Sequence, residues 1–194
     1  MMLAGLLFVT LAAHYYDDAE PGRLDVRAEH LVETIPADTD RPLRVLVRLG
    51  DPLPVVAAAA SLAVLAWLLG RRRLALLAVL GPGLTGVATT LLKPVVGRVL
   101  KGDLAYPSGH TGAATALGIV AALLLVSVVP LSRLGQVLVV GAGALLAGGL
   151  MAVGLTLRAW HYPTDTVGGF CLATVTVLGL ALLLDRFAHR LAEP

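Results

Sequence analysis

The apolar positions of this sequence form long continuous runs instead of the alternating patterns of amphipathic elements. Five runs without a charged side chain reach the length of a membrane-spanning helix, which needs about 20 apolar residues. They are Pro52 to Gly70, Leu74 to Leu92, Thr111 to Leu131, Leu134 to Leu157 and Thr166 to Leu184. Because these runs are hydrophobic on every side, they predict helices surrounded by lipid.

The N-terminal stretch from Met1 to Tyr16 is also apolar and contains no Asp, Glu, Lys or Arg. It is short for a span, but a thinned bilayer or an end within the interface, where Tyr15 and Tyr16 are well suited, accommodates it. We therefore count it as a sixth spanning helix. The alternative is a cleaved signal peptide, which Leu11-Ala12-Ala13 allows but which lacks a positively charged start.

A polar segment of mixed charge, residues 17–51, separates this first helix from the second. Its apolar residues between Leu43 and Leu49 are interrupted by Arg44 and Arg48, which suits a helix on the membrane surface. A solvated loop with a short helix is the alternative. No linker divides the later apolar runs. We expect an all-α fold, a polytopic membrane bundle of about six transmembrane helices, in one membrane-embedded domain over residues 1–194 with 17–51 outside the membrane.

The composition agrees with lipid as the main solvent of the chain. Apolar residues make up 57% and charged residues 14% of the sequence, whereas soluble domains carry roughly 25% charged residues. The net charge of +2 and the scattered basic residues argue against a nucleic-acid partner. Of 15 basic residues 13 are Arg, a bias that indicates a GC-rich bacterial genome. The single Cys171 cannot form an intrachain disulfide, and the sequence leaves the oligomeric state open.

Three polar stretches interrupt the apolar pattern, and with six helices all three fall at the same membrane face. Charges that converge there at the ends of membrane helices predict a functional site. The first stretch, residues 93–101, contains Lys93, Arg98 and Lys101. Such cations hold a phosphate dianion, although anchoring of the helix end at the lipid headgroups also explains them.

The second stretch, residues 106–111, opens the fourth helix of the predicted bundle. Ser108 is suited to cap that helix, and Gly109 lets the backbone approach a ligand closely. The unpaired N–H groups and the positive dipole end favour an anion at this point. A plain helix cap does not need the histidine that follows, so we interpret His110 as a proton donor beside the anion.

The third stretch, residues 158–165, holds a second histidine and another cation, Arg158. His161 and Asp165 are spaced i,i+4, which brings their side chains together in a helical turn. A carboxylate that accepts a hydrogen bond from one ring nitrogen leaves the other as an oriented nucleophile. A lone interfacial histidine is usually structural, but the convergence of three stretches favours an active site.

Together these stretches resemble the three-part signature of the phosphatidic acid phosphatase type 2 (PAP2) superfamily. That signature reads Lys-x6-Arg-Pro, Pro-Ser-Gly-His and Ser-Arg-x5-His-x3-Asp. Residues 107–110 match the middle part in full, and His161 and Asp165 match the end of the last part. The resemblance covers residues 52–185, with helices in the expected places.

Two arginines of the signature are absent from their usual positions. The expected Arg-Pro falls on Leu100 and Lys101, and the expected Ser-Arg falls on Gly154 and Leu155. We expect nearby cations with long side chains to reach the same phosphate from displaced positions. These candidates are Arg98, Lys101 and Arg158.

The resemblance implies metal-independent hydrolysis of a phosphate or pyrophosphate group on a membrane lipid, a polyprenyl or glycerolipid phosphate. In this interpretation His161 attacks phosphorus and forms a phosphohistidine, Asp165 orients it, and His110 protonates the leaving oxygen. The expected phosphate-binding groups are Lys93, Arg98, Ser108, Gly109, Lys101 and Arg158. No cofactor is expected, and no metal, because Asp165 and Asp103, which follows the first stretch closely, are the only acids in or beside the three stretches.

Two other functions remain open at this point. One is a non-catalytic membrane protein that binds or transports a lipid phosphate, since the absent arginines would slow the chemistry. The other is a vanadate-type haloperoxidase or an enzyme with a soluble substrate, whose signature is similar but which the membrane burial disfavours. The substrate panel that we consider includes polyprenyl phosphates, phosphatidylglycerol phosphate and phosphatidic acid.

The arginines in the loops bear on the orientation of the chain in a cell membrane. Arg71, Arg72 and Arg73 crowd a very short loop, where the positive-inside rule acts most strongly. The arginines on the other side are spread over the long acidic segment 17–51, which is more easily translocated. We therefore expect a multi-pass protein with both termini in the cytoplasm and the site on the extracytoplasmic face.

Overall fold

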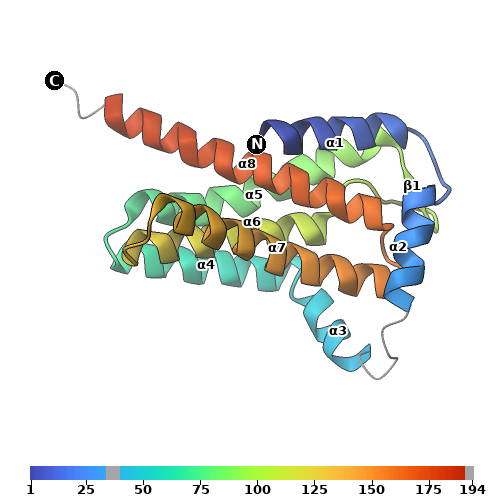
Figure 1. Cartoon of the computed structure of the whole chain (residues 1–194), viewed down its shortest axis with the longest axis horizontal. Coiled ribbons are helices and arrows are strands. Elements are labelled where there is room, and N and C mark those ends of the chain that lie inside the picture. The colour runs from blue at the N-terminus through green and yellow to red at the C-terminus, as the bar shows by residue number, and fades with distance from the viewer. Residues whose placement is uncertain (34–39, 191–194) are drawn as a thin grey trace.

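The computed structural model describes the backbone of residues 1–33 and 40–190 and the side chains of residues 1–31 and 42–187. Long helices lie side by side and a shorter N-terminal helix packs on the last of them (Figure 1). The elements in chain order are α1 (Met2–His14), α2 (Arg23–Glu33), α3 (Asp40–Arg48), α4 (Pro52–Leu68), α5 (Arg72–Val96), β1 (Val99–Leu100), β2 (Asp103–Leu104), α6 (Gly109–Val128), α7 (Arg133–Leu157) and α8 (Pro163–Arg190).

The structure confirms the all-α membrane bundle and makes the count of six spans approximate. Within the described residues, four helices are long and apolar enough to cross a membrane: α5, α6, α7 and α8. The remaining one of the five apolar runs, Pro52 to Gly70, forms α4, which has 17 residues. It reaches the required length only together with residues 42–48 of α3, across a bend of 70°. The N-terminal α1 is apolar but has 13 residues.

The sequence Gly81-Pro82-Gly83 does not break its helix, because α5 continues through it to Val96. Proline removes one backbone N–H from a helix. In α5 this cost is outweighed by packing against α4, α6 and α8. Gly81 lies against Val177 of α8, where a larger side chain would crowd the contact.

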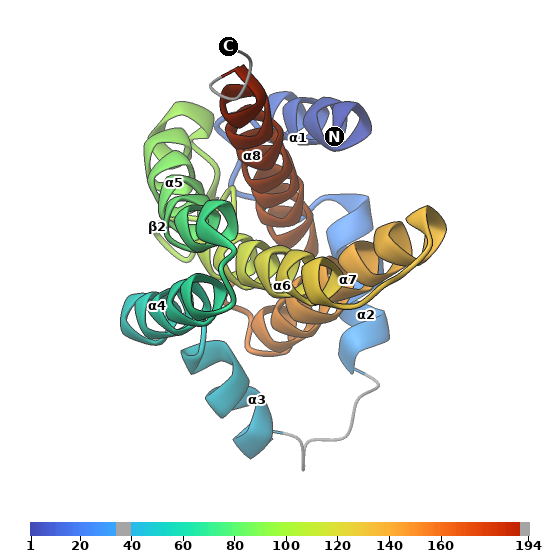
Figure 2. The same ribbon diagram turned by 90° about the vertical axis from the view of Figure 1, so that its left-hand side faces the viewer.

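The centre of the bundle is α6, which packs against α4, α5, α7 and α8 (Figure 2). Its buried face joins small and branched residues of α5 and α8, and this core includes Ala78, Ala116, Ile119, Ala173 and Val177. Glycines let α6 and α7 approach closely, because a Cβ on Gly118 would collide with the backbone of Gly143. The core therefore holds the bundle through close backbone contacts.

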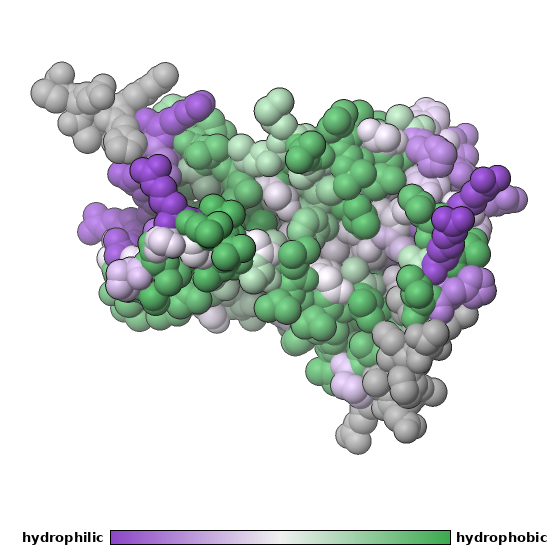
Figure 3. Space-filling view, viewed as in Figure 1, coloured by the Kyte–Doolittle hydropathy of each residue, from purple (hydrophilic) through white to green (hydrophobic). Residues whose placement is uncertain are grey.

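The outer surface of the bundle is apolar between two polar ends. On the face shown in Figure 3, hydrophobic side chains cover the middle, and hydrophilic ones gather at both ends. Exposed leucines and valines are spread over α4, α5 and α7, for example Leu53, Leu91 and Val137. A surface of this kind is stable only in lipid. The chain is therefore a multi-pass membrane protein.

One end of the bundle gathers the polar stretches found in the sequence. The C-terminal ends of α1, α5 and α7 and the N-terminal ends of α4, α6 and α8 lie there (Figure 1). A β-hairpin joins α5 to α6, and its two-residue turn has Lys101 at φ 53° and Gly102 at φ 92°, the positive angles of a type I′ turn. This hairpin was not predicted from the sequence, because its strands have only two residues each.

The described residues of the polar segment 17–51 include two helices, α2 and α3, at the same end. α2 packs against α7 and α8, and α3 packs against α7. Val47 of α3 is buried with Met151 and Leu155, which explains the apolar positions noted in the sequence. The location of α3 on the membrane surface stays a prediction.

Candidate active site

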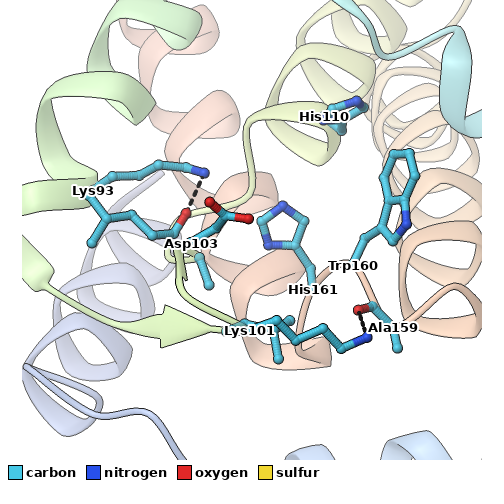
Figure 4. Close-up of a pocket in the computed structure, with 10 residues that line it drawn as sticks. Lys93, Lys101, Asp103, His110, Ala159, Trp160 and His161 are labelled. Atoms are coloured by element: carbon cyan, nitrogen blue, oxygen red, sulfur yellow. Dashed lines mark hydrogen bonds between the residues drawn. The ribbon is translucent and has the colours of Figure 1, made fainter.

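A cavity of about 390 Å³ lies at the polar end of the bundle. It brings together residues from all three polar stretches (Figure 4). Its lining consists of Lys93, Leu100, Lys101, Asp103, Leu104, Ala105, His110, Ala159, Trp160 and His161. The predicted convergence of the stretches at one face is therefore present in the fold.

His161 is nine-tenths buried and lines this cavity, just before the first turn of α8. Its Nδ1 lies 3.5 Å from Oδ2 of Asp165, its nearest acidic neighbour. The same Oδ2 accepts the N–H of Tyr162 at 3.0 Å, the contact of a capping box at a helix start, and Pro163 occupies the first helical position. The local helix cap thus places the carboxylate against the ring of His161.

Ser108 holds the start of α6 and does not line the cavity. It is fully buried, and its Oγ accepts the N–H of Thr111 at 3.4 Å as a helix cap. Its own N–H donates to the carbonyl of Asp165 at 3.0 Å, which ties the second stretch to the third. Gly169 permits this approach, since a Cβ there would collide with the carbonyl oxygen of Ser108.

The first free N–H groups of α6 belong to Gly109 and His110, because that of Thr111 is capped by Ser108. Within the described part of the chain the structure records no partner for either group. N–H groups of this kind at a helix start attract an anion. Gly109 itself lines a neighbouring groove and not the cavity.

His110 lies on the opposite side of the cavity from Lys93 (Figure 4). Its Nε2 is 3.1 Å from Oδ1 of Asp51. Its ring is nearly perpendicular to that of Trp160, with 6.3 Å between the ring centres. Gly50 packs directly on the ring, where a Cβ would come too close to the imidazole. Sequence reasoning missed Asp51, whose place before Pro52 resembles an ordinary helix cap.

Two of the predicted cations line the cavity. Lys93 Nζ donates to the carbonyl of Leu104 at 2.7 Å, and Lys101 Nζ donates to the carbonyl of Ala159 at 3.0 Å (Figure 4). The carboxylate of Asp103 lies between Lys93 and His161 in the same view. Both ammonium groups keep further N–H donors for a ligand, because each carries three.

Arg98, predicted to bind phosphate, lies outside the cavity. It is fully buried, and its guanidinium pairs with Asp165 at 2.6 Å and with Asp25 at 2.7 Å. This position contradicts a direct contact with a phosphate in the cavity. Arg98 instead holds the carboxylate that faces His161, a role that its spacing from Lys93 did not reveal.

Arg158 also does not line the cavity. Its guanidinium lies over the ring of Trp160, 5.1 Å from the ring centre. Trp160 in turn lines the cavity. The predicted contact of Arg158 with phosphate is therefore not supported by its position, and the stacking on Trp160 places its guanidinium against a residue of the cavity wall.

A groove of about 530 Å³ begins beside His110 and runs between α4 and α5. Its lining is almost entirely small and apolar, including Val55, Ala59, Val79 and Gly83. His110 lines both the groove and the cavity. A long apolar chain in the groove would therefore carry its polar head to His110.

No group of three or more His, Cys, Asp or Glu side chains is close enough to hold a metal ion within the described residues. Asp103 is the acidic residue of the cavity lining. Two further carboxylates beside the cavity are engaged with protein partners, Asp165 with Arg98 and Asp51 with His110. The metal-free mechanism stays a prediction.

Comparisons with known proteins agree with the sequence signature. A family model described as the PAP2 superfamily matches residues 93–188. The fold is similar to the crystal structure of the first transmembrane PAP2-type phosphatidylglycerolphosphate phosphatase from Bacillus subtilis, with a TM-score of 0.68 and 21% sequence identity. This likeness covers 97% of the present chain and 96% of the other. A search of curated proteins found no match.

Proposed function

Because the chain belongs to the PAP2 superfamily through residues 93–188, we propose that it hydrolyses a phosphate or pyrophosphate group from a membrane lipid. One observation carries this proposal. His110 and His161 line a single cavity with Lys93 and Lys101, and an apolar groove leads away from His110. The cavity suits the charged head of the substrate, and the groove suits its tail.

The first half of the proposed reaction transfers the phosphoryl group to the protein. The free ring nitrogen of His161 attacks phosphorus while the bond between phosphorus and the lipid oxygen breaks. The leaving oxygen takes a proton from His110, so the lipid departs as an alcohol or, from a pyrophosphate, as a monophosphate. Asp165 stabilises the positive charge that develops on the ring of His161.

The second half returns the protein to its starting state. Water attacks the phosphohistidine, His110 takes up the proton of that water, and the bond between phosphorus and nitrogen breaks. Inorganic phosphate leaves. The cations Lys93 and Lys101 and the N–H group of His110, which all belong to the cavity lining, are suited to stabilise the equatorial oxygens in both steps.

The groove favours a substrate with a long apolar tail, either a glycerolipid phosphate or a polyprenyl phosphate. The similar solved structure is that of a phosphatidylglycerolphosphate phosphatase by its printed description. That lipid therefore belongs in the first panel of substrates, together with phosphatidic acid and a polyprenyl pyrophosphate. A substitution that fills the groove, such as Gly83→Leu, should raise the KM for long-chain lipids while sparing short-chain ones.

The deciding experiment measures release of inorganic phosphate by the purified protein in detergent. We expect release from at least one lipid of the panel, loss of release in His161→Ala, and an acid-labile, base-stable phosphate trapped on the wild-type chain. A non-catalytic lipid-phosphate-binding or transport protein is the alternative. It would bind the lipid phosphates without releasing phosphate from any of them, and this result would reject the phosphatase.

We further propose that the site faces the extracytoplasmic side of the cell membrane, on the charge argument from the short loop at Arg71 to Arg73. Tyr16 is exposed at the site end, and Arg72 is exposed at the other end. In a Cys171→Ala background, Tyr16→Cys should react with a membrane-impermeant thiol reagent on intact cells, and Arg72→Cys should not. The reverse labelling pattern would place the site in the cytoplasm.

A further inference from the structure

A second cluster of charges lies behind the cavity and contains an acidic residue from outside the family match. Asp25 of α2 is fully buried, and its Oδ2 lies 2.7 Å from Nη2 of Arg98. Nη1 of Arg98 lies 2.6 Å from Oδ1 of Asp165. Arg98 is thus shared between two carboxylates, one of which faces His161.

The cluster is closed by hydrogen bonds and aromatic rings. Oδ1 of Asp25 accepts both the N–H and the hydroxyl of Thr164, at 2.9 Å and 2.7 Å. The guanidinium of Arg98 lies between the rings of Tyr15 and Tyr162, 3.7 Å and 4.4 Å from their centres. Burial raises the pKa of both phenols, so neither ring adds a negative charge beside Arg98.

The net charge of this cluster determines how well a positive charge on the His161 ring is stabilised. With one arginine and two carboxylates, the cluster carries a net charge of minus one. Without Asp25, the pair of Arg98 and Asp165 would be neutral, and the positive charge of Arg98 would oppose an imidazolium on His161. The charges of Asp25, Arg98, Asp165 and His161 follow one another at 2.6 to 3.5 Å. Electrostatic interactions at these distances are strong in a buried site, where water screens them little.

We propose that Asp25 is a positioning residue of the phosphatase site. It shares Arg98 with Asp165, which fixes the Asp165 carboxylate and offsets the arginine charge, so that Asp165 can stabilise the charge that develops on His161. The inference rests on the proposed function for its kinetic consequence. It extends the site to the N-terminal segment, which the family match at residues 93–188 does not include.

The first test separates charge from simple structural support by means of three variants. Asp25→Asn brings the cluster to a net charge of zero, and Arg98→Gln brings it to minus two. The double variant Asp25→Asn/Arg98→Gln restores minus one. We expect Asp25→Asn to lower kcat about tenfold with KM unchanged, corresponding to about 1.4 kcal/mol, and the double variant to regain most of that loss.

A role in packing alone predicts the opposite order, because each added substitution would remove further buried hydrogen bonds. A double variant with a lower kcat than Asp25→Asn would therefore overturn the proposal. If Asp25→Asn does not yield folded protein, the double variant decides alone: a kcat within about tenfold of wild type is expected, and a loss beyond about a hundredfold rejects the proposal. Thr164→Val is the matched control, since it removes hydroxyl contacts to Asp25 and Arg98 without changing the charge.

A second readout does not depend on catalysis. In protein with ¹⁵N-labelled histidine, the His161 signals are identified by their loss in His161→Gln. They should shift in Asp25→Asn and return toward their wild-type positions in the double variant. Unchanged signals in Asp25→Asn would refute the role of Asp25 even in an active phosphatase. Shifted signals in a protein that releases no phosphate would instead leave Asp25 in place and reject the proposed function.

Discussion

Two groups of charged side chains lie at the same end of the bundle, and they use their cations in opposite ways. The open cavity holds Lys93 and Lys101, whose ammonium groups rest on backbone carbonyls. The closed cluster holds Arg98, which is fully buried and paired with two carboxylates. A cation is available to a substrate only where its partners are weak and the site is open. The comparison shows that spacing along the chain does not distinguish these situations.

The largest expected difference between the two regions concerns stability. Arg98→Met leaves Asp25 and Asp165 buried without a counter-charge, and breaking a buried ion pair in this way costs about 3–5 kcal/mol. Lys93→Met removes a cation that faces the cavity and should change the free energy of unfolding by less than about 1 kcal/mol. Denaturant unfolding of both variants in detergent measures the difference. Equal losses would show that the closed cluster is not the more tightly coupled region.

The second prediction concerns catalysis. A substitution in the open cavity should have little effect on stability but a large effect on kcat, because the cation that it removes faces the substrate. Lys93→Ala removes a donor of the cavity lining that we propose to bind the phosphate, and loss of such a donor lowers kcat by about 10²–10³-fold. The protein should remain folded. Arg133→Ala at the other end of the bundle is the control for a general effect of lost charge. A Lys93→Ala rate near that of this control would exclude Lys93 from the site.

The third prediction concerns His110 and its partner Asp51, at the border between the cavity and the groove. Asp51→Asn keeps a hydrogen-bond acceptor but removes the charge 3.1 Å from Nε2 of His110. We expect about a tenfold loss of kcat on lipid substrates, part of the 10²–10⁴-fold that a general acid contributes. p-Nitrophenyl phosphate has a leaving group that needs no proton, so its hydrolysis should be nearly unaffected. An equal loss on both substrates would contradict the assignment of His110 as the acid.

Much of the fold could be predicted because the lipid environment imposes a simple pattern. Long uncharged runs identify spanning helices to within a few residues, and α7 (Arg133–Leu157) begins one residue before the predicted start at Leu134 and ends at the predicted Leu157. The pattern left the number of spans approximate where length is marginal, in α1 and in the bent pair of α3 and α4. It also gave no sign of the β-hairpin, whose strands have only two residues each.

The site could be predicted only as far as local spacing determines it. The i,i+4 spacing of His161 and Asp165 predicted their proximity. In the structure His161 lies just before α8 and Asp165 in its first turn, and the helix cap brings the two side chains together. Asp25 and Asp51 reach the site through the tertiary arrangement of α2 and of the bend before α4. Neither residue stands in a recognisable motif. Arg98 was found by its position near Lys93, but its direction into the protein depends on contacts with α2 and α8.

The smallest expected effects on catalysis belong to the last two cations. Lys101 lies at the exposed tip of the hairpin, and Arg158 lies beside the cavity. Lys101 lines the cavity but is exposed, so solvent screens its charge, and Lys101→Ala should lower kcat/KM only about three- to tenfold. Arg158 does not line the cavity, and its guanidinium lies over Trp160. Arg158→Ala should therefore stay within about twofold of wild type, because its guanidinium stacks on the indole and is not part of the cavity lining. Raising the salt concentration provides the internal check, since the Lys101 effect should shrink and the Arg158 effect should not change. A larger loss in Arg158→Ala than in Lys101→Ala would mean that Arg158 turns toward the phosphate when a lipid is bound, and would restore it to the phosphate-binding group.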